Sequence, residues 1–120
     1  MDEDPRPAEV IIDGLIGYSL RGAARGRAAE LIGWSSATAS AVLALDVPSG
    51  LDATHGPTDG PVVAADATMT LAAPKVGLAG NPEQVGDLYL ADISVPRAVY
   101  ESLGFDALGG LGRAPIVRVV

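Results

Sequence analysis

Two apolar segments with a helical pattern between them constrain this chain more than any other feature of its sequence. Residues 10–12 are a continuous β-branched run and residues 41–47 are a second apolar run, and turn-forming residues follow both segments, as is typical of strands. Residues 26–36 carry apolar or small side chains at helical spacing, namely Ala28, Leu31, Ile32 and Ser35. A strand, a helix and a strand in this order predict parallel pairing with a right-handed crossover. The predicted fold class is therefore α/β.

Further strands continue the pattern along the chain. Two strands are expected at 67–72 and 87–93, and a last strand at 116–120. A long loop is expected at 48–65 and one or two helical turns at 97–103. Residues 1–8 are interpreted as a flexible lead and residues 98–120 as a C-terminal extension. The continuous apolar runs predict strands buried on both faces, yet one full helix cannot cover both faces of a sheet. We therefore expect a bare face, which a missing part of the domain or a partner would cover.

The composition restricts the possible partners. A formal net charge of −7 opposes binding to nucleic acid or to an anionic membrane, because both need clustered Lys and Arg. The chain has no Cys and a single His, which rules out a disulfide framework and a thiolate or histidine metal cluster. No apolar run approaches the roughly 18 residues of a membrane span, and residues 1–8 lack the basic start and apolar run of a secretory signal. A cytoplasmic location is predicted.

The first two predicted strands each lead to an aspartate, Asp13 and Asp46. Ligands bind at the carboxyl ends of the strands in open α/β sheets, so both carboxylates are candidates for a functional site. Asp46 stands before the turn 48–50 and either caps that turn by accepting backbone N–H groups or acts as a general acid and base against a ligand. Asp13 has the same alternatives, and oxygen-rich strand ends also suit a hard cation.

A glycine-punctuated segment and the only lysine complete the candidate residues. Residues 17–22, Gly-Tyr-Ser-Leu-Arg-Gly, either bind a phosphate through backbone N–H groups and Arg21 or connect strand and helix through glycines with positive φ. Lys75 follows the third strand and is either part of the site or a solubilising loop charge. Three polar residues of the long loop are interpreted as solvated: Asp52, His55 and Asp59.

Taken together, these segments resemble the NAD(P)H-hydrate epimerase family, whose domain is the YjeF N-terminal type. The resemblance covers residues 8–97 in the family's order and spacing, and its most specific part is Asp-Val-Pro-Ser-Gly-Leu-Asp at 46–52. The other matching blocks are 10–22, 64–71, 73–78 and 86–93. The resemblance implies a Rossmann-like three-layer α/β/α fold with a mainly parallel sheet, incomplete at its N-terminal side, in which residues 9–97 form the carboxyl-terminal half of the domain.

The same resemblance implies an activity and a set of site residues. The family interconverts the R and S epimers of hydrated NADH and NADPH at the nicotinamide C6 carbon, and it binds a potassium ion. Asp46 would contact the hydrated ring as acid and base, and Lys75 would stabilise a carboxylate or orient the substrate. Asp13 and Ser49 would be potassium ligands. The residues implied to hold the substrate's phosphates are Gly17, Tyr18, Ser19, Leu20, Arg21, Gly22 and Ala23.

The chain departs from the family upstream of these blocks. The family's first half carries an Asn-Asn-Gly-Gly-Asp loop that supplies a further potassium ligand and much of the nucleotide site, and this sequence contains no such loop. We therefore expect a fragment, or one half of a split epimerase, with little turnover alone. A separate N-terminal half or a second copy of the chain would cover the exposed sheet. The alternative is a non-catalytic remnant that binds nucleotides weakly or serves as an interaction module.

Overall fold

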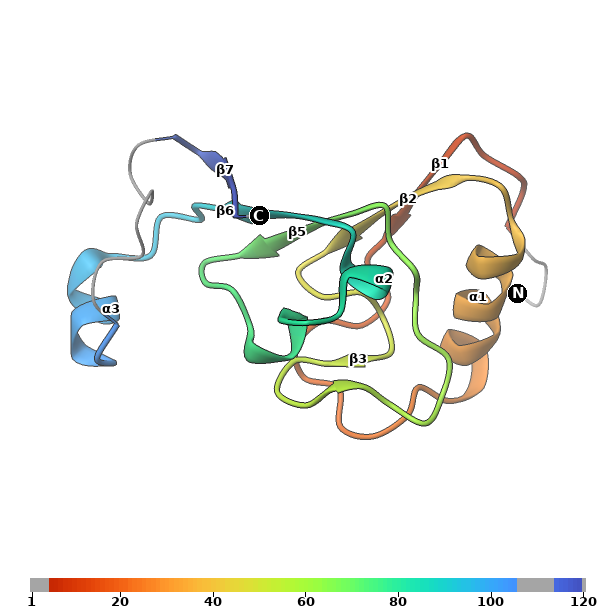
Figure 1. The fold of residues 1–120 in the computed structure, drawn as a ribbon, viewed down its shortest axis with the longest axis horizontal. Helices are drawn as coiled ribbons and strands as arrows, with labels where there is room; N and C mark the ends of the chain where they lie inside the picture. Colours follow the sequence, from red (N-terminus) through yellow and green to blue (C-terminus); the bar gives the residue numbers. More distant parts are fainter. Residues whose placement is uncertain (1–4, 106–113, 120) are drawn as a thin grey trace.

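The computed structural model of this chain describes residues 5–105 and 114–119, and its centre is a five-stranded sheet with the order β1-β2-β5-β6-β7 (Figure 1). The strands are β1 (Val10–Asp13), β2 (Ala41–Leu45), β5 (Ala67–Leu71), β6 (Asp87–Ala91) and β7 (Ile116–Arg118). The other elements are helices α1 (Gly26–Ala37), α2 (Pro82–Val85) and α3 (Arg97–Ser102), the 3-10 turn η1 (Val76–Leu78), and the small strands β3 (Leu51–Asp52) and β4 (Gly56–Pro57). Residues 1–4 of the predicted lead and residues 106–113 and 120 of the predicted extension lie outside the described residues.

The sheet is mainly parallel, as the strand–helix–strand pattern predicts. β1 pairs with β2, β2 with β5 and β5 with β6 in parallel, and β7 adds an antiparallel edge. The register places Asp13 opposite Ala44 and Leu45 opposite Met69. The carboxyl ends of β1, β2 and β5 therefore lie at the same edge of the sheet, and the α/β class with a mainly parallel sheet is confirmed.

One face of the sheet holds the apolar core. Val42 and Ala44 of β2 pack with Ile32 of α1 in one buried cluster. A second cluster joins residues that follow β2 to the η1 and α2 turns, namely Val47, Leu51, Leu78 and Val85. The segment after β2 is thus part of the core, and it packs so tightly that a Cβ on Gly77 would lie 2.1 Å from the Asp52 carbonyl oxygen.

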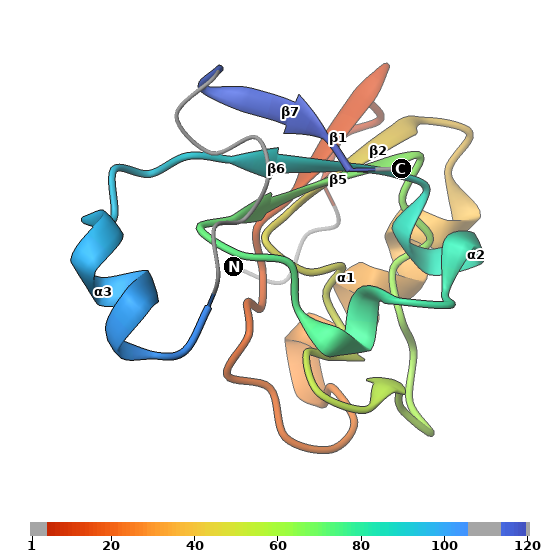
Figure 2. The same ribbon diagram turned by 60° about the vertical axis from the view of Figure 1, so that its left-hand side comes forward.

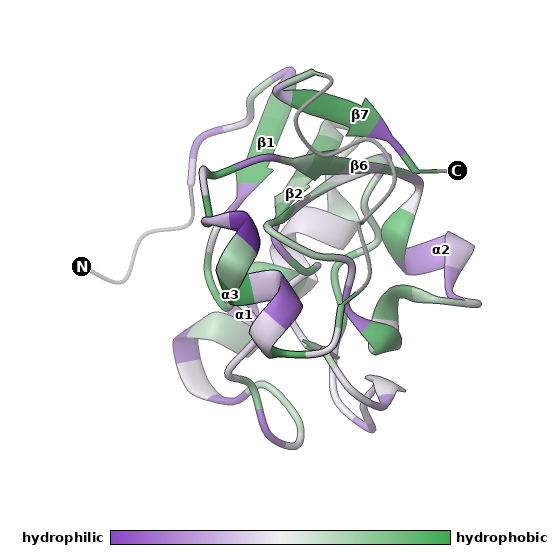
Figure 3. Cartoon of the chain, turned by 90° about the vertical axis from the view of Figure 1, so that its left-hand side faces the viewer, coloured by the Kyte–Doolittle hydropathy of each residue, from purple (hydrophilic) through white to green (hydrophobic). Residues whose placement is uncertain are grey.

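The opposite face of the sheet is apolar and exposed. Val10, Ile12 and Leu43 are 50%, 67% and 43% exposed, and they alternate along their strands with the buried residues. Figure 2 shows α1 and α2 on the same side of the sheet, and Figure 3 shows hydrophobic colouring on β1, β2 and β7. The prediction of a bare face is confirmed, and the prediction of strands buried on both faces is wrong for the described chain. In the described residues, helices α1 and α2 cover one face of the sheet (Figure 2), whereas the resemblance implies a helical layer on each face.

The main elements match the predicted ranges, and the smaller ones were not predicted. β2 ends at Leu45, two residues before its predicted end, because the chain turns sharply at the next residue. The predicted loop 48–65 contains the β3–β4 pair, and α2 begins with Pro82, which suits the first turn of a helix. None of the described helices is long and apolar enough to cross a membrane.

Candidate active site

The carboxyl ends of β2 and β5 turn in the same unusual way. At Asp46 (φ 67°) and Ala72 (φ 65°) the backbone enters the left-handed region, which costs a non-glycine residue about 1–2 kcal/mol. In each turn an N–H donates to the carbonyl two residues before it, over 2.9 Å from Val47 to Leu45 and 2.7 Å from Ala73 to Leu71, as in a strained γ-turn. Such strain persists where the surroundings over-determine the conformation, and it clusters at functional sites.

These two turns bring Asp46 and Lys75 together in an ion pair. The Lys75 ammonium donates to Asp46 Oδ1 at 2.5 Å, and the two side chains are only 14% (Asp46) and 20% (Lys75) exposed. The same ammonium donates to the Leu71 carbonyl at 2.7 Å and to Thr70 Oγ1 at 3.0 Å. Its three protons are therefore all used. An ion pair held this way is worth more than an exposed surface pair, and Lys75 is not a free solubilising charge.

The two carboxylate oxygens of Asp46 have different surroundings. Oδ1 accepts from Lys75 and, at 3.4 Å, from the Leu71 N–H. Oδ2 faces the segment after β1, because a Cβ on Gly17 would lie 3.5 Å from it. The side-chain hydrogen bonds of Asp46 come from Leu71 at the end of β5 and from Lys75 beyond it. The backbone N–H of Ser49 in the 48–50 turn donates to Asp13 instead. The geometry thus leaves one oxygen held and the other directed at the predicted substrate loop.

Thr70 is a site residue that the sequence reasoning did not single out. It is fully buried on β5, and its hydroxyl also lies 3.5 Å from the Ala73 carbonyl. The signal that could have identified it is a threonine on the buried face of a strand, five residues before the only lysine.

Asp13 and Ser49 meet at the end of β1. Asp13 is 3% exposed, and its Oδ2 accepts from the Ser49 N–H at 2.7 Å while its Oδ1 accepts from the Ser49 hydroxyl at 2.6 Å. Ser49 Oγ in turn accepts from the Ile16 N–H at 2.9 Å. Asp13 therefore caps both its own strand end and the 48–50 turn, and the capping alternative describes Asp13 in this structure.

The donors at Asp13 and Ser49 fit part of a cation site. A carboxylate and a hydroxyl are ligands that hard cations prefer, and such ions take several oxygens at once. Here both Asp13 oxygens and Ser49 Oγ are already hydrogen-bonded to each other or to the backbone. Across residues 5–105 and 114–119, no three His, Cys, Asp or Glu side chains are grouped so that they could hold a metal ion. The remaining ligands of any ion would have to come from outside this set.

The predicted substrate loop is open to solvent. Tyr18 is 71% exposed, and Ser19 and Arg21 are exposed as well. Gly22 has φ 74°, so it fills the conformational role expected of a connector glycine. Within the described chain, none of the backbone N–H groups of residues 17–23 donates a hydrogen bond. These groups are available to an anion, so both alternatives for this loop stay compatible with the structure.

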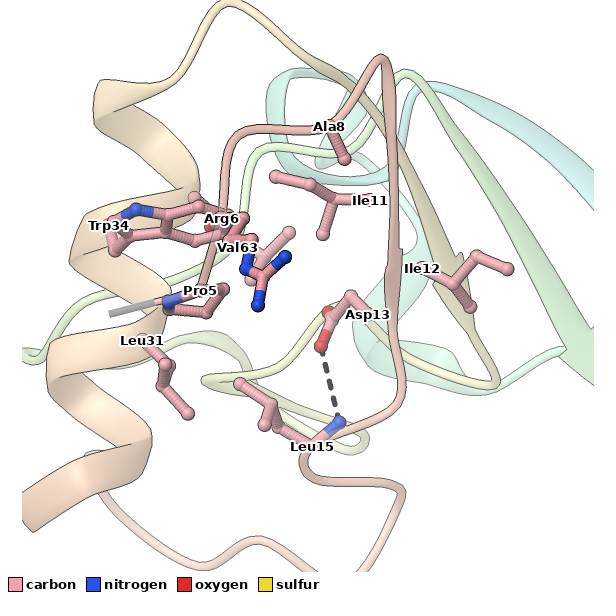
Figure 4. A pocket seen from close by; sticks show the side chains of 11 residues that line it. Pro5, Arg6, Ala8, Ile11, Ile12, Asp13, Leu15, Leu31, Trp34 and Val63 are labelled. Carbon is pink, nitrogen blue, oxygen red and sulfur yellow. Dashed lines mark hydrogen bonds between the residues drawn. The ribbon is translucent and has the colours of Figure 1, made fainter. Parts of the chain in front are cut away.

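A separate pocket of about 270 Å³ lies between β1 and α1. Figure 4 shows Leu31 and Trp34 of α1 facing Ile11 across it, with Pro5 and Arg6 of the lead beside them. The lining is mostly apolar, and Asp13 reaches it only with a carboxylate that is already bonded. Polar groups converge at the strand ends, so we place the candidate site there and not in this pocket.

Of the three loop residues interpreted as solvated, two are exposed and the third, Asp52, is partly buried. The exposed ones are His55 and Asp59, as expected. Asp52 Oδ1 accepts from the N–H groups of Thr54 and His55 at 2.8 and 2.9 Å. These bonds, the His55 N–H first, lower the pKa of Asp52 below its ordinary 3.8, because they stabilise the ionised form.

An open parallel sheet with a carboxylate and a lysine paired at the carboxyl ends of its strands defines a Rossmann-like α/β protein with a strand-end site. The family model described as YjeF-related protein N-terminus matches residues 1–77. The chain belongs to this family, which confirms the resemblance seen in its sequence.

Curated relatives extend the match beyond that range. The chain is 50% identical over 97 residues to the NAD(P)H-hydrate epimerase of Dehalogenimonas lykanthroporepellens, covering 81% of this chain and 39% of the relative. It is 38% identical over 109 residues to the NAD(P)H-hydrate epimerase of Truepera radiovictrix, covering 91% and 48%. The bifunctional NAD(P)H-hydrate repair enzyme Nnr of Hyperthermus butylicus is 41% identical over 95 residues, covering 79% and 18%. The chain thus spans less than half the length of the curated relatives it matches.

A solved structure has the same fold. The crystal structure of the yeast protein ynu0, YNL200c, superposes with a TM-score of 0.77 and covers 92% of this chain and 46% of the yeast chain, at 21% sequence identity. At this identity the likeness extends to the fold alone.

Proposed function

We propose that this chain supplies the strand-end part of an active site that epimerises hydrated NADH and NADPH. One observation carries the proposal: Asp46 is a strained, partly buried carboxylate with Oδ1 held by Lys75 and Oδ2 directed at the loop 17–23. This arrangement stands in a chain that is 50% identical to an NAD(P)H-hydrate epimerase over 97 residues. A carboxylate placed between a fixed cation and an open loop suits proton transfer to a bound ligand.

Asp46 acts as acid and base in this proposal. Its protonated Oδ2 gives a proton to the C6 hydroxyl, the C6–O bond breaks, and water leaves. The C6–O electron pair leaves with that water, so the ring carries a positive charge. A second water then adds to the other face of C6 and neutralises the ring by losing a proton, which the Asp46 carboxylate takes up. The Lys75 ammonium, in contact with Oδ1, keeps the carboxylate in place between the two steps.

The loop and the Asp13–Ser49 pair take supporting roles. The free N–H groups of 17–23 and the Arg21 side chain bind the substrate's phosphates. Asp13 and Ser49 contribute oxygens to a potassium ion, which would supply positive charge close to the nucleotide. The other ion ligands come from a part of the domain outside this chain. We place the protein in the cytoplasm, where its nucleotide substrates would be used.

A second candidate function rests on the exposed face of the sheet. Ile12, Leu43 and Leu45 are exposed there, and apolar surface of this kind marks an interaction site. A separate N-terminal half or a second copy of the chain would cover it. If the covering partner brings no nucleotide-binding residues, the chain would be a non-catalytic interaction module of the same family.

Two preparations test the proposal. In the first, the purified chain alone is incubated with each epimer of hydrated NADPH, and the other epimer is measured by chromatography. In the second, the chain replaces the matched 97 residues of the Dehalogenimonas epimerase. We expect turnover by the chimera and little by the chain alone.

The chimera also carries the decisive substitution. Asp46→Asn is expected to abolish turnover while nucleotide affinity stays within about tenfold, since the amide keeps the shape and loses the proton-transferring oxygen. An active Asp46→Asn chimera would remove Asp46 from the mechanism. A correctly folded chimera without activity would favour the non-catalytic alternative.

A further inference from the structure

We propose that Thr70 is a positioning residue of this site, acting through Lys75 to hold Asp46 with Oδ2 as its proton-transferring oxygen. The inference rests on the proposed role of Asp46. Thr70 lies within the matching block 64–71, but neither the motifs nor the resemblance gave it a role in the site. It concerns how the ion pair is fixed in space, so its test does not depend on turnover.

The ammonium of Lys75 has three protons and three acceptors. These are a carboxylate oxygen of Asp46, the Thr70 hydroxyl at 3.0 Å and the Leu71 carbonyl at 2.7 Å. A lysine bound only to a carboxylate can rotate about its flexible stem. Two further acceptors on the rigid strand β5 remove that freedom and fix the ammonium at one carboxylate oxygen.

Holding Oδ1 decides which oxygen of Asp46 reacts. Oδ1 has two donors, Lys75 and the Leu71 N–H, so it is the poorer site for a transferred proton. Oδ2 faces Gly17, which has no side chain to cover it. If the ammonium moved, only the 3.4 Å bond from the Leu71 N–H would still hold Oδ1, and the distinction between the two oxygens would weaken.

The strand itself contains a matched control for this inference. Thr68 stands two residues before Thr70 on β5, and both side chains are fully buried. The Thr68 hydroxyl donates to the Val85 carbonyl at 2.7 Å and is not one of the three acceptors of the Lys75 ammonium. A Thr→Val substitution at either position removes a buried hydroxyl of the same strand, and only the one at Thr70 removes an acceptor of the ammonium.

The experiment uses the single lysine as its probe. The folded chain is treated with the N-hydroxysuccinimide ester of acetic acid, and acylation of Lys75 is followed by peptide mass spectrometry with the α-amino group as internal reference. We expect Thr70→Val to acylate about tenfold faster, because a hydrogen bond to a charged group is stronger than a neutral one. Thr68→Val and Thr70→Ser should stay within about twofold of the unchanged chain.

Equal rates for Thr70→Val and Thr68→Val would overturn the inference. If Thr70→Val does not fold, the unchanged chain decides the question by NMR. The single ammonium resonance should then show a nuclear Overhauser contact to the Thr70 methyl group, and its absence would refute the positioning role. A chimera without epimerase activity would leave these results untouched and would overturn only the proposed function.

Discussion

Gly17 is predicted to matter for access to Asp46 and not for folding. Its backbone lies outside the left-handed region, and the Cβ of an alanine would lie 3.5 Å from Asp46 Oδ2, which is an ordinary van der Waals distance. Gly17→Ala should therefore fold, and should gain about 0.4–1 kcal/mol from the smaller conformational freedom of the unfolded chain. The new methyl group would stand beside Oδ2, on the side where the proposed substrate loop lies.

The expected effect on turnover is large. Proton transfer needs the reacting oxygen within about 2.6–3.2 Å of Oδ2, and a methyl group in contact with Oδ2 keeps a ligand atom farther away. A misplacement of about 1 Å costs about 100-fold in rate. We therefore expect Gly17→Ala to lower the turnover of the chimera at least about 100-fold, measured as conversion of one epimer of hydrated NADPH into the other.

Gly14 provides the control. A Cβ on Gly14 would lie 3.9 Å from Leu45 Cδ1, so Gly14→Ala adds the same methyl group in the same segment, away from Asp46. Both variants are unfolded in urea and assayed side by side. If Gly17→Ala unfolds at much lower urea than Gly14→Ala, the prediction that Gly17 is not needed for folding is wrong. If Gly17→Ala folds and keeps the same turnover, the assignment of Oδ2 as the reactive oxygen is wrong.

Three further predictions concern stability. Ala72→Gly should raise the free energy of unfolding by about 0.5–1 kcal/mol, because glycine removes the cost of the left-handed backbone. Ala73→Gly is the control and should lower the free energy of unfolding. If both variants lowered it equally, the backbone at Ala72 would not be strained. Gly77→Ala should lower the free energy of unfolding by about 1–3 kcal/mol, since its Cβ meets the Asp52 carbonyl oxygen; an unchanged free energy of unfolding would refute the close packing. The lowered pKa of Asp52 stabilises the folded chain above pH 3.8, and that contribution is lost at more acid pH. Between about pH 6 and about pH 2.5 the urea midpoint of Asp52→Asn should therefore fall less than that of the unchanged chain. An equal fall in the two proteins would contradict this.

The fold could be predicted as far as local patterns reach. The run 10–12 and the run 41–47 lie in strands, and the helical spacing of 26–36 ends within one residue of α1, because apolar periodicity follows directly from which face a segment buries. The β3–β4 pair and η1 could not be predicted. They form because Leu51 and Leu78 enter one core cluster, which depends on contacts between distant segments.

The site was predicted less evenly than the fold. The motif at 46–52 pointed to Asp46, and its place after a strand put it at the sheet edge. Lys75, which pairs with Asp46, was a candidate as well. The other two acceptors of its ammonium, the Thr70 hydroxyl and the Leu71 carbonyl, received no role from the sequence, since one belongs to an ordinary strand residue and the other is backbone. The capping role that was open for both aspartates falls to Asp13, and no local signal separates the two.

By itself, the sequence determined the α/β class, the family, the strand-end position of the candidate residues and the bare face of the sheet. These follow from hydrophobic periodicity and from one specific motif, both of which are local. The tertiary structure decided which oxygen of Asp46 is held, which hydroxyl fixes Lys75, and that Asp13 is bound to Ser49. Parallel pairing brings together strand ends that are 25 or more residues apart in the sequence, and only the register and the turns at those ends set the distances between their side chains.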